Sequence, residues 1–380
     1  MLNPFDTPDR VEFRKVLRNF VSKEIMPYCN EWDEEGQIPW KLHQKTGELG
    51  VWGFGIEKKY GGLGMDDCFM RVIFNEELGL CGTGGVSAAM NGRMISIEPI
   101  QRLASEEIKS RVLPEIVSGR KGSSLAITEP SCGSDVAGLT TSARKDGNHF
   151  IINGSKTFIT GGMTSDYFVV GARTGGPGLE GISLFFLDAD TEGLQRTPLE
   201  KKMGWWCSDQ ATLYFNNLRV PAENLMGEED NGFISIMENF NYERLSLSGG
   251  VLGMMKACLE ESINWAKERY TFGKPLISRQ VIRHKIADMS AKIDAVEAYL
   301  NQVCWLFNNG KKPIAEISKL KFFATKALEF CASEAMQILG GAGYLRGNRV
   351  ERIYREVKVM AIGGGSEEIM RDLAVRQMGL

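Results

Sequence analysis

The stretch FISIMENFNYERLSLSGGVLGMMKAC, residues 233–258, decides how the last third of the chain folds. At about 100° per residue, its apolar side chains fall within an arc of about 80°, which predicts a long helix packed along one face. The members of this stripe are Phe233, Ile236, Phe240, Glu243, Leu247, Val251, Met254 and Cys258. Glu243 is the one charged member. Burial without a partner would raise its pKa and make it a stronger base.

Periodicity alone leaves two interpretations of Glu243 open. The first is a structural ion pair with Arg244, the next residue, or with another cation. The second is a catalytic base in an apolar site, where desolvation tunes the carboxylate for removing a proton from carbon. Glutamates are common in helices and buried catalytic ones are rare, so the pattern by itself favours the ion pair.

Working outward from this helix, the chain divides into helical, β and helical regions. The predicted fold class is α+β and mostly α. We expect an N-terminal helical domain (1–122), a middle antiparallel β-barrel domain (123–230) and a C-terminal four-helix bundle (231–380). The bundle helices are expected near 231–270, 278–308, 313–339 and 366–377. The middle region carries short aromatic and β-branched strands at 149–152, 167–170, 182–186 and 212–215.

Composition excludes several classes of protein. Among 380 residues, 43% are hydrophobic and 24% charged, and the net charge is −3, so wholesale disorder and a nucleic-acid partner are disfavoured. No apolar run approaches the roughly 18 residues needed to span a membrane, and the start lacks the features of a signal peptide. We therefore expect a cytoplasmic protein with no membrane insertion. Eight scattered cysteines without a C-x-x-C pair, and three histidines, predict buried thiols rather than zinc or disulfides.

One motif in the middle region is misleading. Residues 176–181, GPGLEG, match the G-x-G-x-x-G fingerprint of dinucleotide-binding proteins. That fingerprint works only where a helix follows and presents its N-terminus to a pyrophosphate. Here a strand follows, so we interpret the segment as a hairpin connection.

Three other segments are turn-like and rich in small residues. They are LAITEPSCGSD (125–135), QILGGAGY (337–344) and IGGGSEEIMR (362–371). The first could offer hydroxyl and backbone N–H groups to a polar ligand, although alone it is as well explained as a linker. The second alone is a helix end. The third runs three glycines into a new helix, which would bring N–H groups close to an anion or a carbonyl oxygen.

Taken together, these segments carry a resemblance over residues 5–380. TEPSCGSD (128–135), KTFITGG (156–162), RYTFGKPL (269–276), QILGGAGY (337–344) and GGGSEEIMRD (363–372) resemble, in order and spacing, the acyl-CoA dehydrogenase family of flavoproteins. The resemblance implies an FAD cofactor bound between the β domain and the bundle. It implies oxidation of an acyl-CoA to the trans-2-enoyl-CoA in fatty-acid β-oxidation, electron transfer to electron-transferring flavoprotein, and a homotetramer built as a dimer of dimers.

The resemblance also implies roles for individual residues. Contacts with FAD within the subunit are implied for Leu125, Ile127, Thr128, Gly133, Ser134, Phe158, Ile159, Thr160, Ser366 and Glu368. Contacts with the FAD of a neighbouring subunit are implied for Arg269, Phe272, Gln280, Gln337, Ile338, Gly340 and Gly341. Acyl-CoA contacts are implied for Ser134, Tyr242, Arg244 and Gly364. The acyl tail is expected between the two helical domains, with Met90, Met94, Ile95 and Leu247 as possible lining.

Two departures from the family pattern bear on the mechanism. Many members place the catalytic glutamate in the final loop, where this chain has Gly364, whereas a second group, including isovaleryl-CoA and long-chain dehydrogenases, places it in a Glu-Arg-Leu context on the first bundle helix. Here that context is Glu243-Arg244-Leu245. We therefore expect Glu243 to remove the α-proton while flavin N5 takes the β-hydride, with the Gly364 N–H and an FAD ribityl hydroxyl on the thioester oxygen. Phe158 stands where many relatives have tryptophan.

Other activities of this scaffold stay open at this point. An acyl-CoA oxidase, a desulfinase or a cyclic-acyl dehydrogenase would share these motifs. A DNA-associated alkylation-response flavoprotein would need a basic surface that the balanced charge does not suggest. The length and branching of the acyl group are not given by the sequence.

Overall fold

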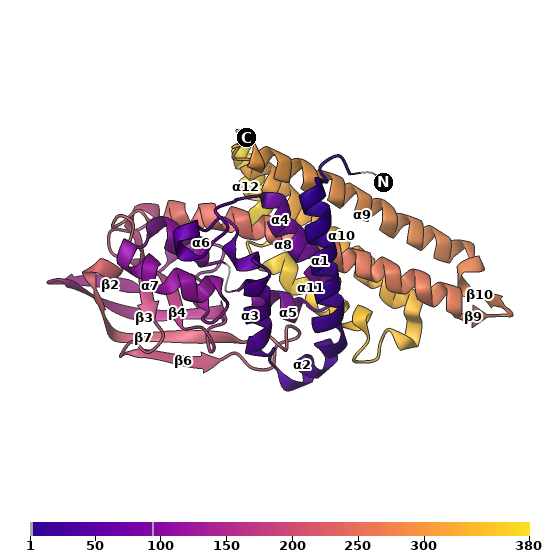
Figure 1. The fold of residues 1–380 in the computed structure, drawn as a ribbon, viewed down its shortest axis with the longest axis horizontal. Helices are drawn as coiled ribbons and strands as arrows, with labels where there is room; N and C mark the ends of the chain where they lie inside the picture. Colours follow the sequence, from indigo (N-terminus) through magenta and orange to yellow (C-terminus); the bar gives the residue numbers. More distant parts are fainter. Residues whose placement is uncertain (1–2, 93–94) are drawn as a thin grey trace.

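The computed structural model describes residues 3–92 and 95–380. Helices come first, a sheet follows, and long helices complete the chain (Figure 1). The N-terminal helices lie against both the sheet and the long helices. The predicted α+β, mostly α fold class is confirmed.

The N-terminal helical region begins with a capped helix. Thr7 accepts a hydrogen bond from the Arg10 N–H and Pro8 occupies the first helical turn, so the start of the first helix is capped. The helices are α1 (Pro8–Glu24), α2 (Cys29–Glu35), α3 (Trp40–Glu48), α4 (Cys68–Gly79), α5 (Gly84–Asn91), α6 (Ile97–Leu103) and α7 (Glu106–Val117).

A single sheet forms the middle region. Its strands are β1 (Ser123–Ala126), β2 (Ser142–Asp146), β3 (His149–Thr160), β4 (Tyr167–Arg173), β5 (Ile182–Asp188), β6 (Leu194–Pro198), β7 (Gln210–Pro221) and β8 (Leu225–Met226). The strand order is β6-β7-β3-β2-β4-β5-β8, and β1 also pairs with β4. Most pairs are antiparallel as expected, but β1 and β2 each pair with β4 in parallel. The G-x-G-x-x-G segment joins the antiparallel strands β4 and β5, which confirms the hairpin interpretation.

The C-terminal region contains the long helices. They are α8 (Gly232–Glu268), α9 (Gln280–Asn308), α10 (Ile314–Leu339), α11 (Arg349–Ile362) and α12 (Glu367–Gln377), with a hairpin of β9 (Tyr270–Thr271) and β10 (Lys274–Pro275) between α8 and α9. The sequence analysis missed α11, because its charged residues obscure a regular apolar face. That face is buried and consists of Val350, Ile353, Val357 and Met360.

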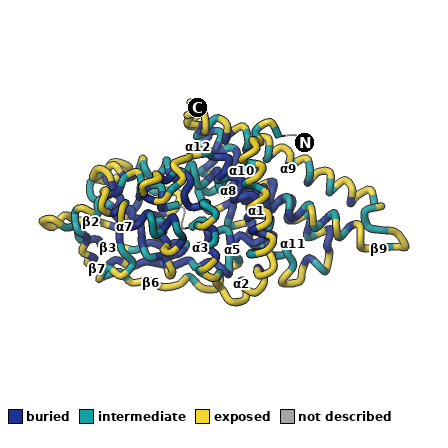
Figure 2. Tube along the Cα trace, in the orientation of Figure 1, coloured by how far each residue is buried: buried dark blue, intermediate teal, exposed yellow. Residues whose placement is uncertain are grey.

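Glycines allow α8 to approach α4 closely. A Cβ at Gly253 would lie 2.1 Å from the Glu76 carbonyl oxygen, and one at Gly249 would lie 2.8 Å from the Val72 carbonyl oxygen. These contacts bury the middle of α8 between α4 and α10, as the dark tube in Figure 2 shows. Glycine at these positions therefore fixes the depth of the helix that carries Glu243.

The cysteine and membrane expectations can be compared with the described residues. All eight cysteines are buried and free of disulfides. Within residues 3–92 and 95–380, no cluster of histidine, cysteine and acidic side chains suits a metal ion. None of the helices in the same ranges has the length and apolarity needed to cross a membrane.

Candidate active site

Glu243 lies in the first third of α8 with its carboxyl group in the protein interior. Its Oε2 atom is buried and accepts no hydrogen bond, and the described part of the chain contains no ion pair to this side chain. Burial raises the pKa of Glu243, opposed by the positive charges of Arg244 and Lys321. The alternative of a direct structural ion pair with Arg244 is therefore not what the structure shows.

The glycine loop between α11 and α12 faces this carboxyl group. A Cβ built on Gly364 would lie 3.7 Å from Glu243 Oε1 and 3.7 Å from Leu247 Cδ1, which is ordinary van der Waals contact. Gly364 has a φ of +68°, in the left-handed region that glycine adopts without strain. The structure thus brings together the two residues expected to carry the chemistry, 121 positions apart in the sequence.

Gly364→Ala is expected to lower the free energy of unfolding by about 1–2 kcal/mol, the cost of left-handed backbone for a residue with a Cβ. Because the new methyl group would meet no atom closer than 3.7 Å, steric overlap should add little. Urea titration of both proteins checks this value. Gly363→Ala is the matched control, since Gly363 has an extended φ of −65° and should cost less. Equal losses for the two variants would contradict the backbone argument.

Two buried cations hold the loop in place. Arg244 Nε donates to the Gly364 carbonyl at 2.9 Å, and Lys321 Nζ donates to the carbonyls of Ala361 at 2.9 Å and Gly365 at 2.7 Å. Burial lowers the pKa of Arg244, and it lowers the pKa of Lys321 to about 8. Arg244, expected to contact acyl-CoA, therefore also positions the loop opposite Glu243.

Lys321 is a site residue that the sequence analysis missed. It is fully buried on α10. The signal was available, because Ile317, Lys321, Ala324 and Leu328 follow helical spacing and place a lysine within an apolar face. The same argument that singled out Glu243 would have found it.

The two segments expected to touch the flavin lie side by side near the C-terminal end of β3. The Thr157 N–H donates to the Thr128 carbonyl at 2.9 Å. Beneath them, Lys156 and Glu129 form a buried ion pair at 2.9 Å. Glu129 also accepts the Thr141 N–H at 2.8 Å, and its pKa is lowered to about 2, where burial is outweighed by Lys156 and these hydrogen bonds. This pair joins 125–135 to β3.

Phe158 is exposed near the end of β3. Its side chain is 69% exposed and its φ is +58°, unusual for an aromatic residue. The residues around it are placed unequally: Ile127 and Ile159 are buried, Leu125, Thr128 and Thr160 are half-buried, and Gly133 and Ser134 are exposed. An exposed aromatic ring beside loop N–H and hydroxyl groups fits a planar aromatic ligand such as an isoalloxazine ring.

The final turn is organised around Ser366. Its hydroxyl accepts the Ile369 N–H at 3.4 Å and so caps α12, and Glu368 is exposed. Glu367, which the sequence analysis did not single out, is buried and accepts a hydrogen bond from Thr325 at 3.1 Å.

A second group of expected site residues lies elsewhere. Arg269, Phe272 and Gln280 surround the β9–β10 hairpin, and Gln337, Ile338, Gly340 and Gly341 end α10. From Glu243 to Arg269, α8 rises about 39 Å at about 1.5 Å per residue, and the hairpin stands at the opposite end of the molecule from the sheet (Figure 1). One chain therefore does not bring this group to Glu243 or Phe158. Ile338 is buried, whereas Phe272 is 98% exposed.

The other residues expected to contact the substrate lie in different surroundings. The Tyr242 ring packs against Phe307 of α9, with centroids 4.7 Å apart, and the Arg71 guanidinium lies 5.2 Å from it. Leu247 lies beside Gly364, and Met90 is fully buried. The Ile95 carbonyl accepts a hydrogen bond from Asn239 at 2.7 Å. Met94 lies outside the described residues.

Comparisons with known proteins agree with this arrangement. Three family profiles match consecutive parts of the chain: acyl-CoA dehydrogenase N-terminal domain (7–120), middle domain (124–218) and C-terminal domain (230–379). An acyl-CoA dehydrogenase of Bacillus subtilis (strain 168) is 34% identical over 96% of this chain and 96% of its own length. The solved acyl-CoA dehydrogenase of Geobacillus kaustophilus is 34% identical, covers 100% of both chains and has a TM-score of 0.94.

A further solved relative was determined with a bound cofactor. It is a glutaryl-CoA dehydrogenase from Mycobacterium smegmatis in complex with FADH2, 26% identical over 98% of this chain and 95% of that chain, with a TM-score of 0.92. The three profiles, the full-length relatives and the three-part fold lead to one conclusion. The chain belongs to the acyl-CoA dehydrogenase family of oxidoreductases.

Proposed function

We propose that this protein removes hydrogen from the α and β carbons of an acyl-CoA thioester to give the trans-2-enoyl-CoA, with Glu243 as the base. The observation that carries the proposal is the buried Glu243 carboxyl group beside Gly364, whose Oε2 atom has no hydrogen-bond partner among the described residues. Because residue 364 is glycine and has no Cβ, there is room for a substrate carbon between α8 and the loop that joins α11 to α12. A carboxylate that is kept away from water and from direct ion pairs retains its basicity.

The thioester oxygen needs a donor as the α-proton leaves. The Gly364 backbone N–H would supply one, because Lys321 holds the Ala361 carbonyl before it and the Gly365 carbonyl after it, and Arg244 holds the Gly364 carbonyl. A preorganised donor in an apolar site stabilises developing negative charge without reorganisation. Leu247, beside Gly364, helps to exclude water from the same space.

FAD is the cofactor, and it supplies the two-electron acceptor for the β-hydride. The residues that would hold it are Thr128 and Ser134 through polar contacts and Phe158 through its exposed ring. The FADH2 bound to the solved relative supports FAD as the cofactor. The chain's own contribution is to hold the ring and to exclude water from Glu243.

A second copy of the chain completes the cofactor site in this proposal. The hairpin residues Arg269 and Phe272 and the glycines after α10 lie too far from Glu243 to act on the same FAD. Phe272 is 98% exposed and Tyr344 is 83% exposed, which a neighbouring subunit would cover. This supports a homotetramer built as a dimer of dimers.

The wider assignment follows the family. Electrons pass to electron-transferring flavoprotein, and the reaction serves fatty-acid β-oxidation. A cytoplasmic location is an expectation from the sequence alone.

The direct test is anaerobic reduction of the FAD-loaded protein by acyl-CoA. Straight-chain, branched and cyclic acyl-CoA thioesters are mixed with it, and the visible flavin absorbance is followed. The expected result is rapid bleaching by at least one of them, with the enoyl-CoA as product and slow recovery in air. Fast recovery in air would identify an oxidase, and no bleaching by any thioester would contradict the proposal.

A further inference from the structure

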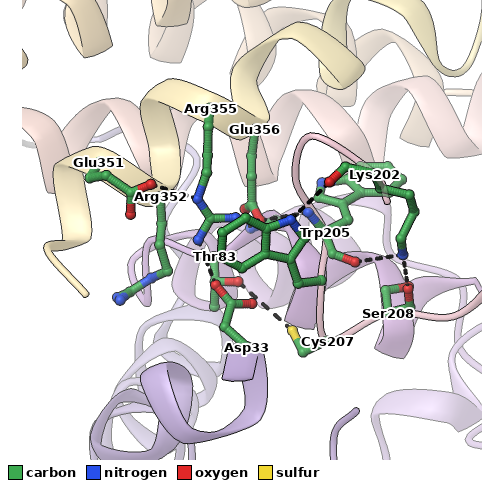
Figure 3. Close-up of polar contacts among 12 residues, drawn as sticks. Asp33, Thr83, Lys202, Trp205, Cys207, Ser208, Glu351, Arg352, Arg355 and Glu356 are labelled. Atoms are coloured by element: carbon green, nitrogen blue, oxygen red, sulfur yellow. Dashed lines mark hydrogen bonds and ion pairs between the residues drawn. The ribbon is translucent and has the colours of Figure 1, made fainter. Parts of the chain in front are cut away.

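A buried carboxylate outside the site described above joins all three regions of the chain. Glu356 of α11 is 1% exposed (Figure 3). Its Oε2 accepts the backbone N–H of Gly84, the first residue of α5, at 2.6 Å. Its Oε1 accepts the backbone N–H of Trp205 at 2.7 Å. Trp205 belongs to the loop 199–209 between β6 and β7, so one side chain holds segments of the helical, sheet and bundle regions together.

The 199–209 loop is packed tightly around this carboxylate. A Cβ at Gly204 would lie 2.6 Å from Glu356 Cγ, and one at Gly85 would lie 2.7 Å from Cys207 Sγ. Trp205 itself has a φ of +56°, a conformation that the surroundings must hold. Its N–H is directed at Glu356, so the carboxylate stabilises the unusual backbone.

From this loop the contacts continue to the segment expected to face the flavin. Lys202 Nζ donates to the Trp205 carbonyl at 2.8 Å, and also to the Ser208 carbonyl (Figure 3). Asp209 Oδ2 accepts the Met163 N–H at 2.7 Å, and its Oδ1 accepts a hydrogen bond from the Thr164 hydroxyl at 3.0 Å. Met163 and Thr164 follow β3, which carries Phe158, after two glycines.

We propose that Glu356 is a positioning residue for bound FAD: it fixes the 199–209 loop, which through Asp209 fixes residues 158–164 against the cofactor. The inference rests on the proposed function, because it needs FAD at Phe158. Glu356 acts through Trp205 and Asp209 and is not itself a catalytic residue.

Charged groups on each neighbouring element bear on its ionisation. Asp33 comes from α2, Arg355, Glu351 and Arg352 from α11, and Lys202 and Cys207 from the loop. Burial and the charge of Asp33 raise the pKa of Glu356, Arg355 and the two N–H groups oppose them, and the resulting pKa is about 7. The ionised carboxylate accepts both N–H groups more strongly than the acid does. The hold on the loop should therefore strengthen as the pH rises through neutrality.

The test compares the FAD-loaded wild type with Glu356→Gln, in which the amide can accept one N–H but not both. The readouts are the visible circular dichroism of the flavin, its reduction potential and its dissociation constant, each measured on both sides of neutral pH. We expect the variant to bind FAD about tenfold more weakly, the effect of losing one charged hydrogen bond. Its flavin dichroism should be altered, and it should lack the change near neutral pH that we expect of the wild type.

The matched control is Glu77→Gln. Glu77 is as deeply buried and accepts hydrogen bonds from Arg14 at 2.8 Å and from Arg18, but its contacts stay between α1 and α4. It should lose thermal stability without a change in the flavin signals. If Glu356→Gln does not fold, Asp209→Asn replaces it, since it breaks the same chain of contacts without touching Glu356.

The proposal is overturned if the folded variant keeps the wild-type dichroism, potential, FAD affinity and pH profile while its stability falls as for Glu77→Gln. These readouts need no acyl-CoA. A wild type that binds FAD but is not reduced by any acyl-CoA would therefore refute the proposed function and leave the positioning result readable.

Discussion

Glu243→Gln is expected to lower the rate of FAD reduction by acyl-CoA about 10³-fold or more. Loss of a general base typically lowers a rate by about 10²- to 10⁴-fold. Glutamine keeps the shape of the side chain and its place beside Gly364 but cannot take a proton at this pH. Because Glu243 forms no described hydrogen bond or ion pair, the substitution should not disturb α8. Stopped-flow absorbance of the flavin, with retained FAD as a condition, measures the change.

The control for this variant is on the same helix. Glu238→Gln makes the same chemical change in α8, but Glu238 is 39% exposed and pairs with Arg102 at 2.6 Å. It should reduce FAD at close to the wild-type rate. A near wild-type rate for Glu243→Gln would remove this residue from the mechanism.

Lys156→Met is expected to lower the free energy of unfolding by about 3–5 kcal/mol, the usual effect of leaving one member of a buried pair unpaired. Lys156 is fully buried and its ammonium group lies 2.9 Å from Glu129. The double variant Lys156→Met with Glu129→Gln should recover part of the loss, since no buried charge is then left unpaired. Denaturant titrations of the three proteins, followed by fluorescence, measure these differences.

The same pair predicts a pH dependence. Because the pKa of Glu129 falls from 4.5 to about 2 in the folded protein, its stabilising contribution is full above pH 4.5 and is lost as the pH falls towards 2. Lys156→Met should reduce this acid-induced loss of stability.

The exposed pair of Arg219 and Asp146 is the control for the stability effect of Lys156→Met. Arg219→Met should lower the free energy of unfolding by less than about 1 kcal/mol. A similar cost for both lysine and arginine variants would contradict the burial argument.

The order of helical and β regions could be predicted because it depends on local patterns. The stripe on α8 has a helical period, so the sequence showed that Glu243 shares a face with Leu247 and Val251. The parallel pairing of β1 with β4 joins segments some forty residues apart. No short turn links them, so the sequence contains no local signal that predicts this pairing. The helix α11 was also missed, because its many charged residues hide the helical spacing of its buried apolar residues.

For the candidate site too, the sequence predicted individual residues but not the tertiary contacts between them. The sequence indicated Glu243 and Gly364 separately, and the resemblance linked them. The contacts that set their environment, from Arg244 to the Gly364 carbonyl and from Lys321 to the Gly365 carbonyl, are tertiary. Glu356 was not found at all, because its partners are backbone N–H groups of Gly84 and Trp205, whose positions no side-chain pattern records.

The most direct measurement of the central assignment separates proton removal from redox chemistry. A 3-thia-acyl-CoA has hydrogens on its α carbon and none at the β position, so it cannot be dehydrogenated. Incubated in D₂O with the FAD-loaded protein, it should gain deuterium at the α carbon, as read by mass spectrometry, and Glu243→Gln should abolish the gain. Unchanged exchange by Glu243→Gln would show that another group removes the proton.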